Sequence, residues 1–473
     1  MTQEPQDSIS KLLRRHQQEH VLRWWPGLNA DQRATLASQL AEIELSQIDS
    51  LWANSSASAT VDESPAQKAL RAVPPAQLVR ARVDNDRDRD AWARARQTGK
   101  ALLREGRVGV ILVAGGEGTR LGFPRPKGEY PIGAVSGKSL FQVLAEQVLA
   151  HSKRAGAPIP YYVMTSQATH DAAVSFFAAH GHFGLAADDV HFFRQGNMPA
   201  VDRNSGRLLL SAKHALALSP DGHGGLLQAL ERAHLLEDMR RRGIDLLFYH
   251  QIDNPLARVC DPAFLGFHVE RDSEVSTKVV AKLNSEEKMG VLVDVDGKTQ
   301  IIEYSDLPAE IAARRNAQEE LLHWAGSTAM HIFNRTFLER LSTQQTGLPF
   351  HRAVKKVSFI DDAGQLVEPT VENAIKYERF VFDVLPLAER SLVVEARRED
   401  EFCPLKNKSG DFSPEHVRDS MSRQYAGWLR AAGIEVPDGL PVEISPRYAL
   451  DAEELANKID RAHNFAGPIY LEQ

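Results

Sequence analysis

Residues 108–128 read VGVILVAGGEGTRLGFPRPKG, and this stretch decides the fold. Its opening run, Val108 to Ala114, is apolar and rich in β-branched side chains, which is typical of a buried parallel strand. Glycines follow at once, so the strand opens onto a loop at its carboxyl end. In α/β sheets, ligands bind beyond the carboxyl ends of the strands. The stretch therefore predicts a ligand-binding loop at a sheet edge.

The loop from Gly115 to Gly122 has the composition of a phosphate-binding site. Glycines let the backbone approach phosphates closely, and the loop amides can donate hydrogen bonds to them. Arg120 and Lys127 add positive charge, which suits a triphosphate and the charge that develops on it. The alternative is a tight turn with no ligand, but the buried strand and the two cations favour binding.

Two common phosphate motifs come close to this region without matching it. The dinucleotide fingerprint G-x-G-x-x-G can start at Gly116, but Leu121 stands where its third glycine belongs. A P-loop needs four residues between its glycines, whereas Gly133 and Gly137 have three between them. The missing third glycine of the dinucleotide fingerprint also disfavours a nicotinamide-dependent oxidoreductase.

Predicted strands and helices alternate on the carboxyl side of this stretch. The predicted elements are a helix over 140–150, a strand over 161–166, a helix over 226–239 and a strand over 245–253. Such alternation indicates a doubly wound α/β domain. Residues 275–304 read as further strands, with Asp296-Gly297 as the turn of a hairpin.

The 473 residues are enough for about three domains. We expect a helical N-terminal region over 1–100, the α/β catalytic domain over 101–385 and a small C-terminal domain over 386–473. In the first region, Leu36, Leu40 and Ile43 have helical spacing, and Asn29 or Asp31 can cap the start of that helix.

Composition excludes several classes of protein. The formal charge of -7 argues against a dedicated nucleic-acid binder, which carries a strongly basic domain. Two cysteines, Cys260 and Cys403, cannot form a disulfide framework and fit a reducing cytoplasm. The polar first residues predict no signal peptide, and no apolar run approaches the ~20 residues of a membrane span. We therefore expect a cytoplasmic protein without membrane or nucleic-acid partners.

The glycine loop resembles a family signature, G-G-x-G-T-R-L-G followed by P-K, of the sugar-nucleotide pyrophosphorylases. Other segments narrow the resemblance to the UDP-N-acetylhexosamine pyrophosphorylase branch of the UDP-sugar pyrophosphorylase family. These segments are MTS at 164–166, FFRQGNMPA at 192–200, PDGHGGL at 220–226, QIDN at 251–254, EYS at 303–305, AIKYERFVFD at 374–383, REDEFCPLKN at 398–407 and EISP at 443–446. Their order and spacing are kept from about residue 100 onward.

The resemblance implies a reaction. UTP and a sugar 1-phosphate, here an N-acetylhexosamine 1-phosphate, would give UDP-sugar and pyrophosphate by in-line attack on the α-phosphate, with Mg²⁺. It also implies a Rossmann-like nucleotidyltransferase domain with a mixed, mainly parallel sheet, in a monomer or homodimer. The alternative is a catalytically idle sugar-nucleotide-binding or regulatory protein on the same fold. Retention of Arg120, Lys127 and Asp253 argues against that alternative, and the sequence does not settle which sugar is preferred.

The resemblance assigns nucleotide-binding roles to individual residues. The backbone of Val113, Ala114, Gly115 and Gly116 would hold the nucleotide, Arg120 and Lys127 would line the triphosphate, Gln195 and Gly222 would lie at the uridine, and Lys376 would contact UTP. A glutamine offers the donor and the acceptor that the edge of uracil requires. Gly222 allows a flat base to approach the backbone closely.

Asp253 follows an apolar strand, where a carboxylate is costly without a partner. A divalent cation that bridges phosphates is the natural partner, so the expected metal ligand is Asp253; a helix cap is the alternative. By resemblance, Lys406 contacts the sugar phosphate and joins Arg120 and Lys127 as a catalytic residue.

The resemblance places the sugar against Glu303 and Tyr304. A carboxylate can accept two sugar hydroxyls, and a tyrosine ring can cover an apolar sugar face. His223 and Ser327 stand where close relatives carry asparagines on the sugar side of the site. Because an asparagine amide pairs well with an N-acetyl group, we expect weaker selection for N-acetylated sugars here.

Overall fold

The protein is described by a computed structural model covering residues 3–56, 65–343, 347–460, 465 and 467–472. The chain divides into two compact units, each assembled from segments that are distant in sequence. The smaller unit is Met1–Glu63, Gln195–Leu226 and Thr346–Asp383, and the larger unit is Ser64–Arg194, Leu227–Gln345 and Val384–Gln473. These limits do not coincide with the predicted boundaries near 100 and 385, so the division into three successive segments stays a prediction.

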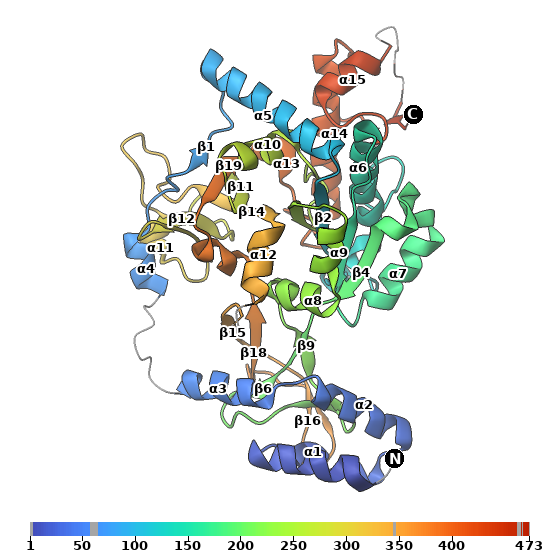
Figure 1. The fold of residues 1–473 in the computed structure, drawn as a ribbon, viewed down its shortest axis with the longest axis vertical. Coiled ribbons are helices and arrows are strands. Elements are labelled where there is room, and N and C mark those ends of the chain that lie inside the picture. The colour runs from blue at the N-terminus through green and yellow to red at the C-terminus, as the bar shows by residue number, and fades with distance from the viewer. Residues whose placement is uncertain (1–2, 57–64, 344–346, 461–464, 466, 473) are drawn as a thin grey trace. The chain divides into compact units, whose positions relative to one another are not determined.

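The larger unit is built on a sheet with the strand order β1-β19-β11-β14-β10-β2-β3-β4, and a hairpin, β12–β13, pairs with β14 (Figure 1). These strands are β1 (Leu78–Val79), β2 (Val108–Val113), β3 (Tyr161–Thr165), β4 (Val190–Arg194), β10 (Leu246–Gln251), β11 (Val275–Ala281), β12 (Val291–Val295), β13 (Lys298–Ile302), β14 (Ala325–Asn334) and β19 (Ser391–Glu395). Along that order, β14 is antiparallel to both neighbours and the other pairs are parallel. The predicted mixed, mainly parallel α/β sheet is confirmed.

Residues with left-handed backbone angles shape two connections of this unit. The β12–β13 hairpin turns at Asp296 and Gly297, whose φ angles of 51° and 77° fit a tight two-residue turn, as predicted. The predicted single helix over 226–239 is wrong, because His234 adopts a left-handed φ of 54°. It separates α8 (Leu226–Arg232) from α9 (Leu235–Arg241).

The larger unit contains further α-helices, before, between and after the strands of this sheet. They are α4 (Pro65–Arg71), α5 (Asp86–Arg104), α6 (Leu140–Ala155), α7 (His170–Ala179), α10 (Pro262–Glu270), α11 (Ala309–Ala312), α12 (Arg335–Ser342), α13 (Arg398–Glu401), α14 (Pro414–Ala431) and α15 (Ala452–Lys458). The start of α6 is capped by Ser139, whose hydroxyl accepts from the Gln142 amide, and its end by Gly156 at a φ of 69°.

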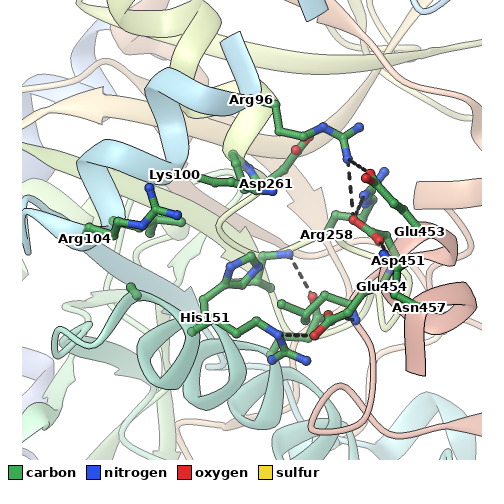
Figure 2. Close-up of a pocket in the computed structure, with 17 residues that line it drawn as sticks. Arg96, Lys100, Arg104, His151, Arg258, Asp261, Asp451, Glu453, Glu454 and Asn457 are labelled. Atoms are coloured by element: carbon green, nitrogen blue, oxygen red, sulfur yellow. Dashed lines mark hydrogen bonds and ion pairs between the residues drawn. The ribbon is translucent and has the colours of Figure 1, made fainter. Parts of the chain in front are cut away.

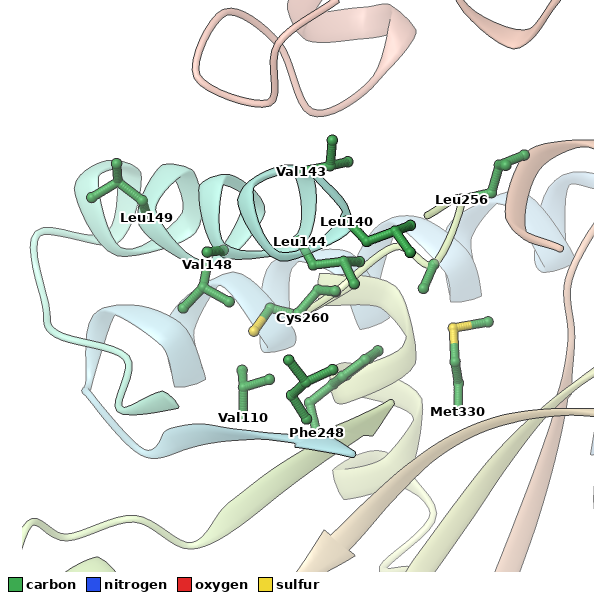
Figure 3. Packing of buried hydrophobic residues seen from close by; sticks show 14 of the residues in the cluster. Val110, Leu140, Val143, Leu144, Val148, Leu149, Phe248, Leu256, Cys260 and Met330 are labelled. Atoms are coloured by element: carbon green, nitrogen blue, oxygen red, sulfur yellow. The ribbon is translucent and has the colours of Figure 1, made fainter. Parts of the chain in front are cut away.

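One face of α6 forms the core against the sheet. Figure 3 shows Leu144 and Val148 of α6 directed toward Val110 of β2 and Phe248 of β10, with Cys260 beside them. All five side chains are buried. Burial of each such aliphatic or aromatic side chain contributes about 1.5–3 kcal/mol, so this packing fixes β2 and β10 side by side.

The C-terminal part of the chain packs onto α6. The Lys138 ammonium donates to Glu146 of α6 at 2.9 Å and to Glu472, after β21 (Ile469–Leu471), at 3.1 Å. β21 pairs with β20 (Val442–Ile444) in parallel. The helix α15 lies near the carboxyl end of α6, where Arg154 contacts Glu454 at 2.6 Å.

The smaller unit combines N-terminal helices with short strands. Its elements are α1 (Gln3–Arg15), α2 (Ala30–Ala41), α3 (Leu45–Ser56), β5 (Asn197–Pro199), β6 (Val201–Asp202), β7 (Leu210–Ala212), β8 (Ala215–Leu216), β9 (Leu218–Pro220), β15 (Phe350–Lys355), β16 (Phe359–Ile360), β17 (Leu366–Val367) and β18 (Ala374–Arg379). Asn29 caps α2 in a reciprocal pair with Gln32, as predicted. Strands β15, β18 and β6 form an antiparallel sheet. Among the described residues, no helix combines the length and apolar character that a membrane crossing needs.

Candidate active site

The glycine loop follows β2 directly and closes on itself. The Lys127 amide donates to the Gly116 carbonyl at 3.1 Å, and the Gly118 amide donates to the Arg125 carbonyl at 2.9 Å. A Cβ on Gly118 would lie 2.7 Å from the Phe123 carbonyl oxygen, so only glycine fits there. Internal hydrogen bonds and close packing therefore hold the loop in one conformation, with Lys127 at a fixed position.

Gly116 has the opposite surroundings to Gly118. A Cβ added to Gly116 would meet nothing within 4 Å, so packing does not demand glycine at this position. Among the described residues, the amides of Gly115 and Gly116 make no hydrogen bond, whereas the Ala114 amide donates to Met164 at 2.7 Å. The loop thus offers two free donors over an open space, as close approach of an anion requires.

Asp253 lies at the same sheet edge as this loop. Strands β2 and β10 run parallel with Val113 opposite Gln251, and the Ile252 amide donates to the Val113 carbonyl at 3.0 Å. Asp253 does not cap a helix, because the next helix, α10, begins at Pro262 and is capped by Asp261. The carboxyl ends of the two strands therefore bring the predicted metal ligand beside the predicted phosphate loop.

Lys127, Asp253 and Lys406 lie together here, and the charge of Arg120 acts on Lys127. We name these four side chains the catalytic cluster, after the role expected from the sequence. The Lys406 ammonium lies 3.4 Å from the Asp253 carboxylate, and the Lys127 ammonium donates to the Leu405 carbonyl at 3.2 Å. The Leu405 amide in turn donates to the Asp253 carbonyl at 2.7 Å. The Lys406 side chain is 55% exposed, so its charge is free to meet a ligand.

The charges in this cluster affect one another. Burial lowers the pKa of the Lys127 ammonium below its ordinary value, and the positive charges of Lys406 and Arg120 lower it further against the pull of Asp253. Burial alone would raise the pKa of Asp253, but Lys406 and Lys127 outweigh it and hold that pKa below its ordinary value. Asp253 is thus an anion, surrounded by cations that an incoming polyphosphate can share.

Sequence reasoning missed a residue that positions the cluster. The buried Asn254 amide nitrogen donates to the Glu401 carbonyl at 2.7 Å, and its amide oxygen accepts from the Cys403 backbone at 3.2 Å. Asn254 therefore clamps the segment that carries Lys406 to the end of β10. A polar side chain directly after Asp253 was the available signal.

The predicted sugar residues of the larger unit gather around Gly290. A Cβ on Gly290 would lie 2.8 Å from a Glu303 carboxylate oxygen, and the Gly290 carbonyl accepts from the Ser327 amide at 2.9 Å. The Ser327 hydroxyl accepts from the Ala329 amide at 3.3 Å, beside a left-handed φ of 56° at Ala329. Tyr304 is 48% exposed, which leaves its ring available to a ligand.

The smaller unit holds a second group of predicted site residues. The buried Gln195 side chain donates to the Gly222 carbonyl at 3.4 Å. Gly222 has a φ of 84°, and a Cβ there would lie 2.3 Å from the Arg379 carbonyl oxygen. Glycine at 222 is therefore demanded by the backbone itself, in addition to any role toward a base.

His223 and Lys376 belong to the same unit. The His223 Nδ1 accepts from the Val381 amide at 3.1 Å, and its ring lies 5.4 Å from that of Phe380. This hydrogen bond leaves Nε2 as the protonated nitrogen, a donor. Lys376 lies half-buried on β18, opposite Ala353 of β15.

The site could hold a metal ion only with a single protein carboxylate, the remaining ligands coming from the substrate and water. Among the described residues, no group of three or more His, Cys, Asp or Glu side chains could hold a metal ion. Mg²⁺ sites in phosphoryl-transfer proteins commonly use one or two carboxylates and complete their shell with substrate phosphates and water. Asp253, ionised and adjacent to the glycine loop, fits that arrangement.

Comparison with known proteins shows the family of this chain. Residues 63–426 match the profile of a family described as UTP–glucose-1-phosphate uridylyltransferase. The chain belongs to this family of UDP-sugar pyrophosphorylases. A human relative, UDP-N-acetylhexosamine pyrophosphorylase-like protein 1, is 35% identical, with 99% of this chain and 97% of the relative covered. The UDP-N-acetylglucosamine pyrophosphorylase of Saccharomyces cerevisiae is also 35% identical, with 89% and 88% covered.

The fold of the family is seen in a solved structure as well. The UDP-N-acetylglucosamine pyrophosphorylase of Trypanosoma brucei, in complex with an inhibitor, superposes with a TM-score of 0.83 at 24% identity. The match covers all of this chain and 99% of that chain. At this identity the likeness shows the fold alone, and it agrees with the α/β architecture expected for the family.

Proposed function

We propose that the protein is a uridylyltransferase, which joins UTP and an N-acetylhexosamine 1-phosphate to give UDP-sugar and pyrophosphate. The observation that carries this proposal is the catalytic cluster at the carboxyl ends of β2 and β10. Two cations, Lys127 and Lys406, act on a single carboxylate, Asp253, and the charge of Arg120 acts on Lys127. Two free loop amides follow the neighbouring strand β2. Such an excess of positive charge is suited to two anionic substrates.

The chemistry asks the protein mainly to position and to neutralise charge. A sugar 1-phosphate is already an anion, so no general base is needed. Lys127 and the Gly115 and Gly116 amides would bind the triphosphate, while Lys406 would hold the sugar phosphate for in-line attack on the α-phosphorus. Fixed donors stabilise the charge of the pentacoordinate transition state without reorganisation. A Mg²⁺ held by Asp253 would neutralise part of the charge on the phosphate oxygens.

The remaining roles extend this proposal. Gln195 and Gly222 would receive the uracil, and Lys376 would contact UTP. Glu303, Tyr304, Ser327 and His223 would receive the sugar. The relatives named for UDP-N-acetylglucosamine support an N-acetylated sugar, but His223 and Ser327 replace the two asparagines expected there. A histidine Nε2–H can donate to an acceptor but cannot offer the paired donor and acceptor of an amide.

The other candidate is a sugar-nucleotide-binding protein without turnover. This candidate is considered because the human relative is named a pyrophosphorylase-like protein rather than a pyrophosphorylase. Steady-state release of pyrophosphate separates the two, measured with UTP, Mg²⁺ and each of GlcNAc-1-P, GalNAc-1-P, Glc-1-P and Gal-1-P. The proposal expects release with the N-acetylated sugars and appreciable release with the others. Tight binding of UDP-GlcNAc with no release from any sugar would instead establish the binding protein.

A further inference from the structure

A pocket of about 340 Å³ lies in the larger unit between α5, α6, α15 and the segment that precedes α10 (Figure 2). None of the residues in the catalytic cluster lines it. Its five basic side chains are Arg96, Lys100, Arg104, Arg154 and Arg258. The first three recur every fourth residue along α5, so they share one face of that helix.

Two of the four acidic groups in the pocket have close basic partners. Asp261 pairs with the buried Lys278 ammonium at 2.6 Å. Glu454 contacts Arg154 at 2.6 Å and Lys458 at 2.6 Å. Lys278 also pairs with Glu401, so Asp261 and Glu401 keep one negative charge between them, which the neighbouring Arg258 offsets. Glu454 has two basic partners, which leaves one positive charge there.

The other charges of the pocket are not balanced. Arg96 lies 3.6 Å from Asp451 and 3.7 Å from Glu453, and Arg258 lies 4.0 Å from Asp451, all beyond hydrogen-bond distance. In the part of the chain that the structure describes, no hydrogen bond is made by the side chain of Arg96, Lys100, Arg104 or Arg258. Arg96, Lys100 and Arg104 thus face two carboxylates, and Lys458 adds one positive charge at Glu454, so the pocket with its paired neighbours carries an excess of two positive charges.

The histidine of the pocket does not change this balance near neutral pH. Burial and the neighbouring Arg154 together lower the pKa of His151 to about 4. The ring is therefore neutral at pH 7, and it lines the pocket as a group that can form a hydrogen bond with a ligand. Figure 2 shows it between the α5 cations and the acidic side chains of α15.

We propose that this pocket binds a small phosphate monoester, a metabolite whose phosphate carries close to two negative charges. The excess of two positive charges matches that dianion. Guanidinium groups with unfilled donors bind phosphate oxygens through paired, charge-assisted hydrogen bonds. Part-enclosed walls, including Leu103, Val259 and Leu450, leave room for a compact organic body beside the phosphate.

The pocket is linked to the catalytic cluster by a short stretch of backbone. Arg258 lies on the segment that begins at Asp253 and ends at Asp261, whose amide donates to the Arg258 carbonyl at 3.2 Å. Asp261 and Glu401 share the Lys278 ammonium, and Glu401 ends α13, directly before the segment that carries Lys406. A ligand on Arg258 therefore acts on the segment that begins at Asp253 and, through the shared Lys278, on the segment that carries Lys406. This effect on rate, unlike binding, rests on the proposed function.

Isothermal titration with glucose 6-phosphate tests the binding without any activity assay. The variant Lys100→Gln plus Arg104→Gln removes two pocket charges, and Arg87→Gln plus Arg89→Gln removes two exposed charges from the same helix as a matched control. We expect the pocket variant to bind at least about tenfold more weakly, the loss of one or two charge-assisted hydrogen bonds. The control should bind as the wild type does. Glu453→Gln, which removes a repelling carboxylate, should tighten the binding of inorganic phosphate.

Several results would overturn the assignment. Binding that is equal in the pocket variant and the wild type would place the ligand elsewhere. Equal affinity for inorganic phosphate and glucose 6-phosphate would show a site for inorganic anions only. In pyrophosphate release, saturating glucose 6-phosphate should change kcat at least about twofold in the wild type and not in the pocket variant. The same response in both proteins, or none in either, would overturn the link to the catalytic cluster.

Discussion

Two clusters of lysines and carboxylates lie in the larger unit, and they are built in opposite ways. In the structural cluster, Lys278 contacts Asp261 at 2.6 Å and also Glu401, and its side chain is only 2% exposed. In the catalytic cluster, Lys406 lies 3.4 Å from Asp253 and is 55% exposed. The first places two acids around one base, and the second places two bases near one acid, with the charge of Arg120 acting on one of those bases, Lys127.

The difference follows from what each cluster must do. Buried charges must be paired and hydrogen-bonded closely, because each one left unpaired loses its hydration without compensation. Burial alone would raise the pKa of Asp261, but the Lys278 ammonium and Arg258 hold it below its ordinary value. The catalytic cluster keeps its partners loose and its charge unbalanced, so anionic substrates can complete it. Close pairing thus indicates structure here, and an open excess of one charge indicates function.

Removal of the central base of the structural cluster should have the largest effect. Lys278→Met leaves the Asp261 and Glu401 carboxylates buried without their partner, at a cost of about 3–5 kcal/mol in the free energy of unfolding. Chemical denaturation at pH 7 measures it. Lys288→Met, at an exposed position, is the control and should cost less than about 0.5 kcal/mol. A small loss in Lys278→Met would show that the structural cluster is not essential to folding.

Neutralising the acid of the catalytic cluster should reduce activity more than stability. Asp253→Asn keeps the shape but loses the carboxylate, and we expect kcat/KM for pyrophosphate release to fall about 10²-fold with a raised Mg²⁺ requirement. Asp245→Asn, at the other end of β10, removes a half-exposed partner of Arg107 and serves as the control. Unchanged Mg²⁺ dependence in Asp253→Asn would remove Asp253 from the metal site.

A buried group that cannot find a partner should make the fold acid-sensitive. Burial lowers the pKa of His250 to about 3, and neither ring nitrogen has a hydrogen-bond partner among the described residues. The unfolded chain takes up this proton below about pH 6.5 and the folded chain does not, so stability falls as the pH drops from about 6.5 toward 3. At pH 5 this one group costs ~2 kcal/mol.

The variant His250→Phe isolates this contribution. His250 stacks on Tyr161 at 6.2 Å, a position that another ring can fill. The loss of unfolding free energy between pH 7 and pH 5 should be smaller in His250→Phe than in the wild type by about that amount. The same loss in both proteins would assign the acid sensitivity to other groups.

The smallest effect concerns the sugar. His223→Asn combined with Ser327→Asn should shift the ratio of kcat/KM for GlcNAc-1-P over Glc-1-P about tenfold toward the N-acetylated sugar, the worth of about one hydrogen bond. The side chain at 223 lies against Phe380 and at 327 beside Ala329, and the new amides would replace a single donor and a hydroxyl. If the wild type already prefers GlcNAc-1-P and the double variant does not exceed it, these positions do not set the sugar.

Part of this molecule was predictable from its sequence. The apolar run at Val108, the glycines after it and the aspartate after β10 predicted a binding edge, because parallel strands bring their carboxyl ends together. The turn at Asp296-Gly297 was predictable because few residue pairs adopt its backbone angles. These features depend on local chemistry.

Other features depend on contacts between distant segments, and no local pattern predicts them. The smaller unit is assembled from segments that begin near residues 1, 195 and 346. The clamp by Asn254 and the pocket between α5, α6 and α15 exist only once the sheet has formed. Alternating charges such as those along α5 are typical of a solvated helix face, and only the structure shows that three of its cations share a pocket.

The most direct test of the account is pyrophosphate release from UTP and GlcNAc-1-P by the wild type and Lys127→Ala, measured beside the Tm of both. We predict turnover by the wild type and a kcat/KM lower by about 10²–10³ in the variant, the loss of one preorganised cation at the transition state. The Tm should be nearly unchanged, as in the exposed-lysine control Lys153→Ala. No release by the wild type, or equal release by both proteins, would contradict the assignment of the catalytic cluster.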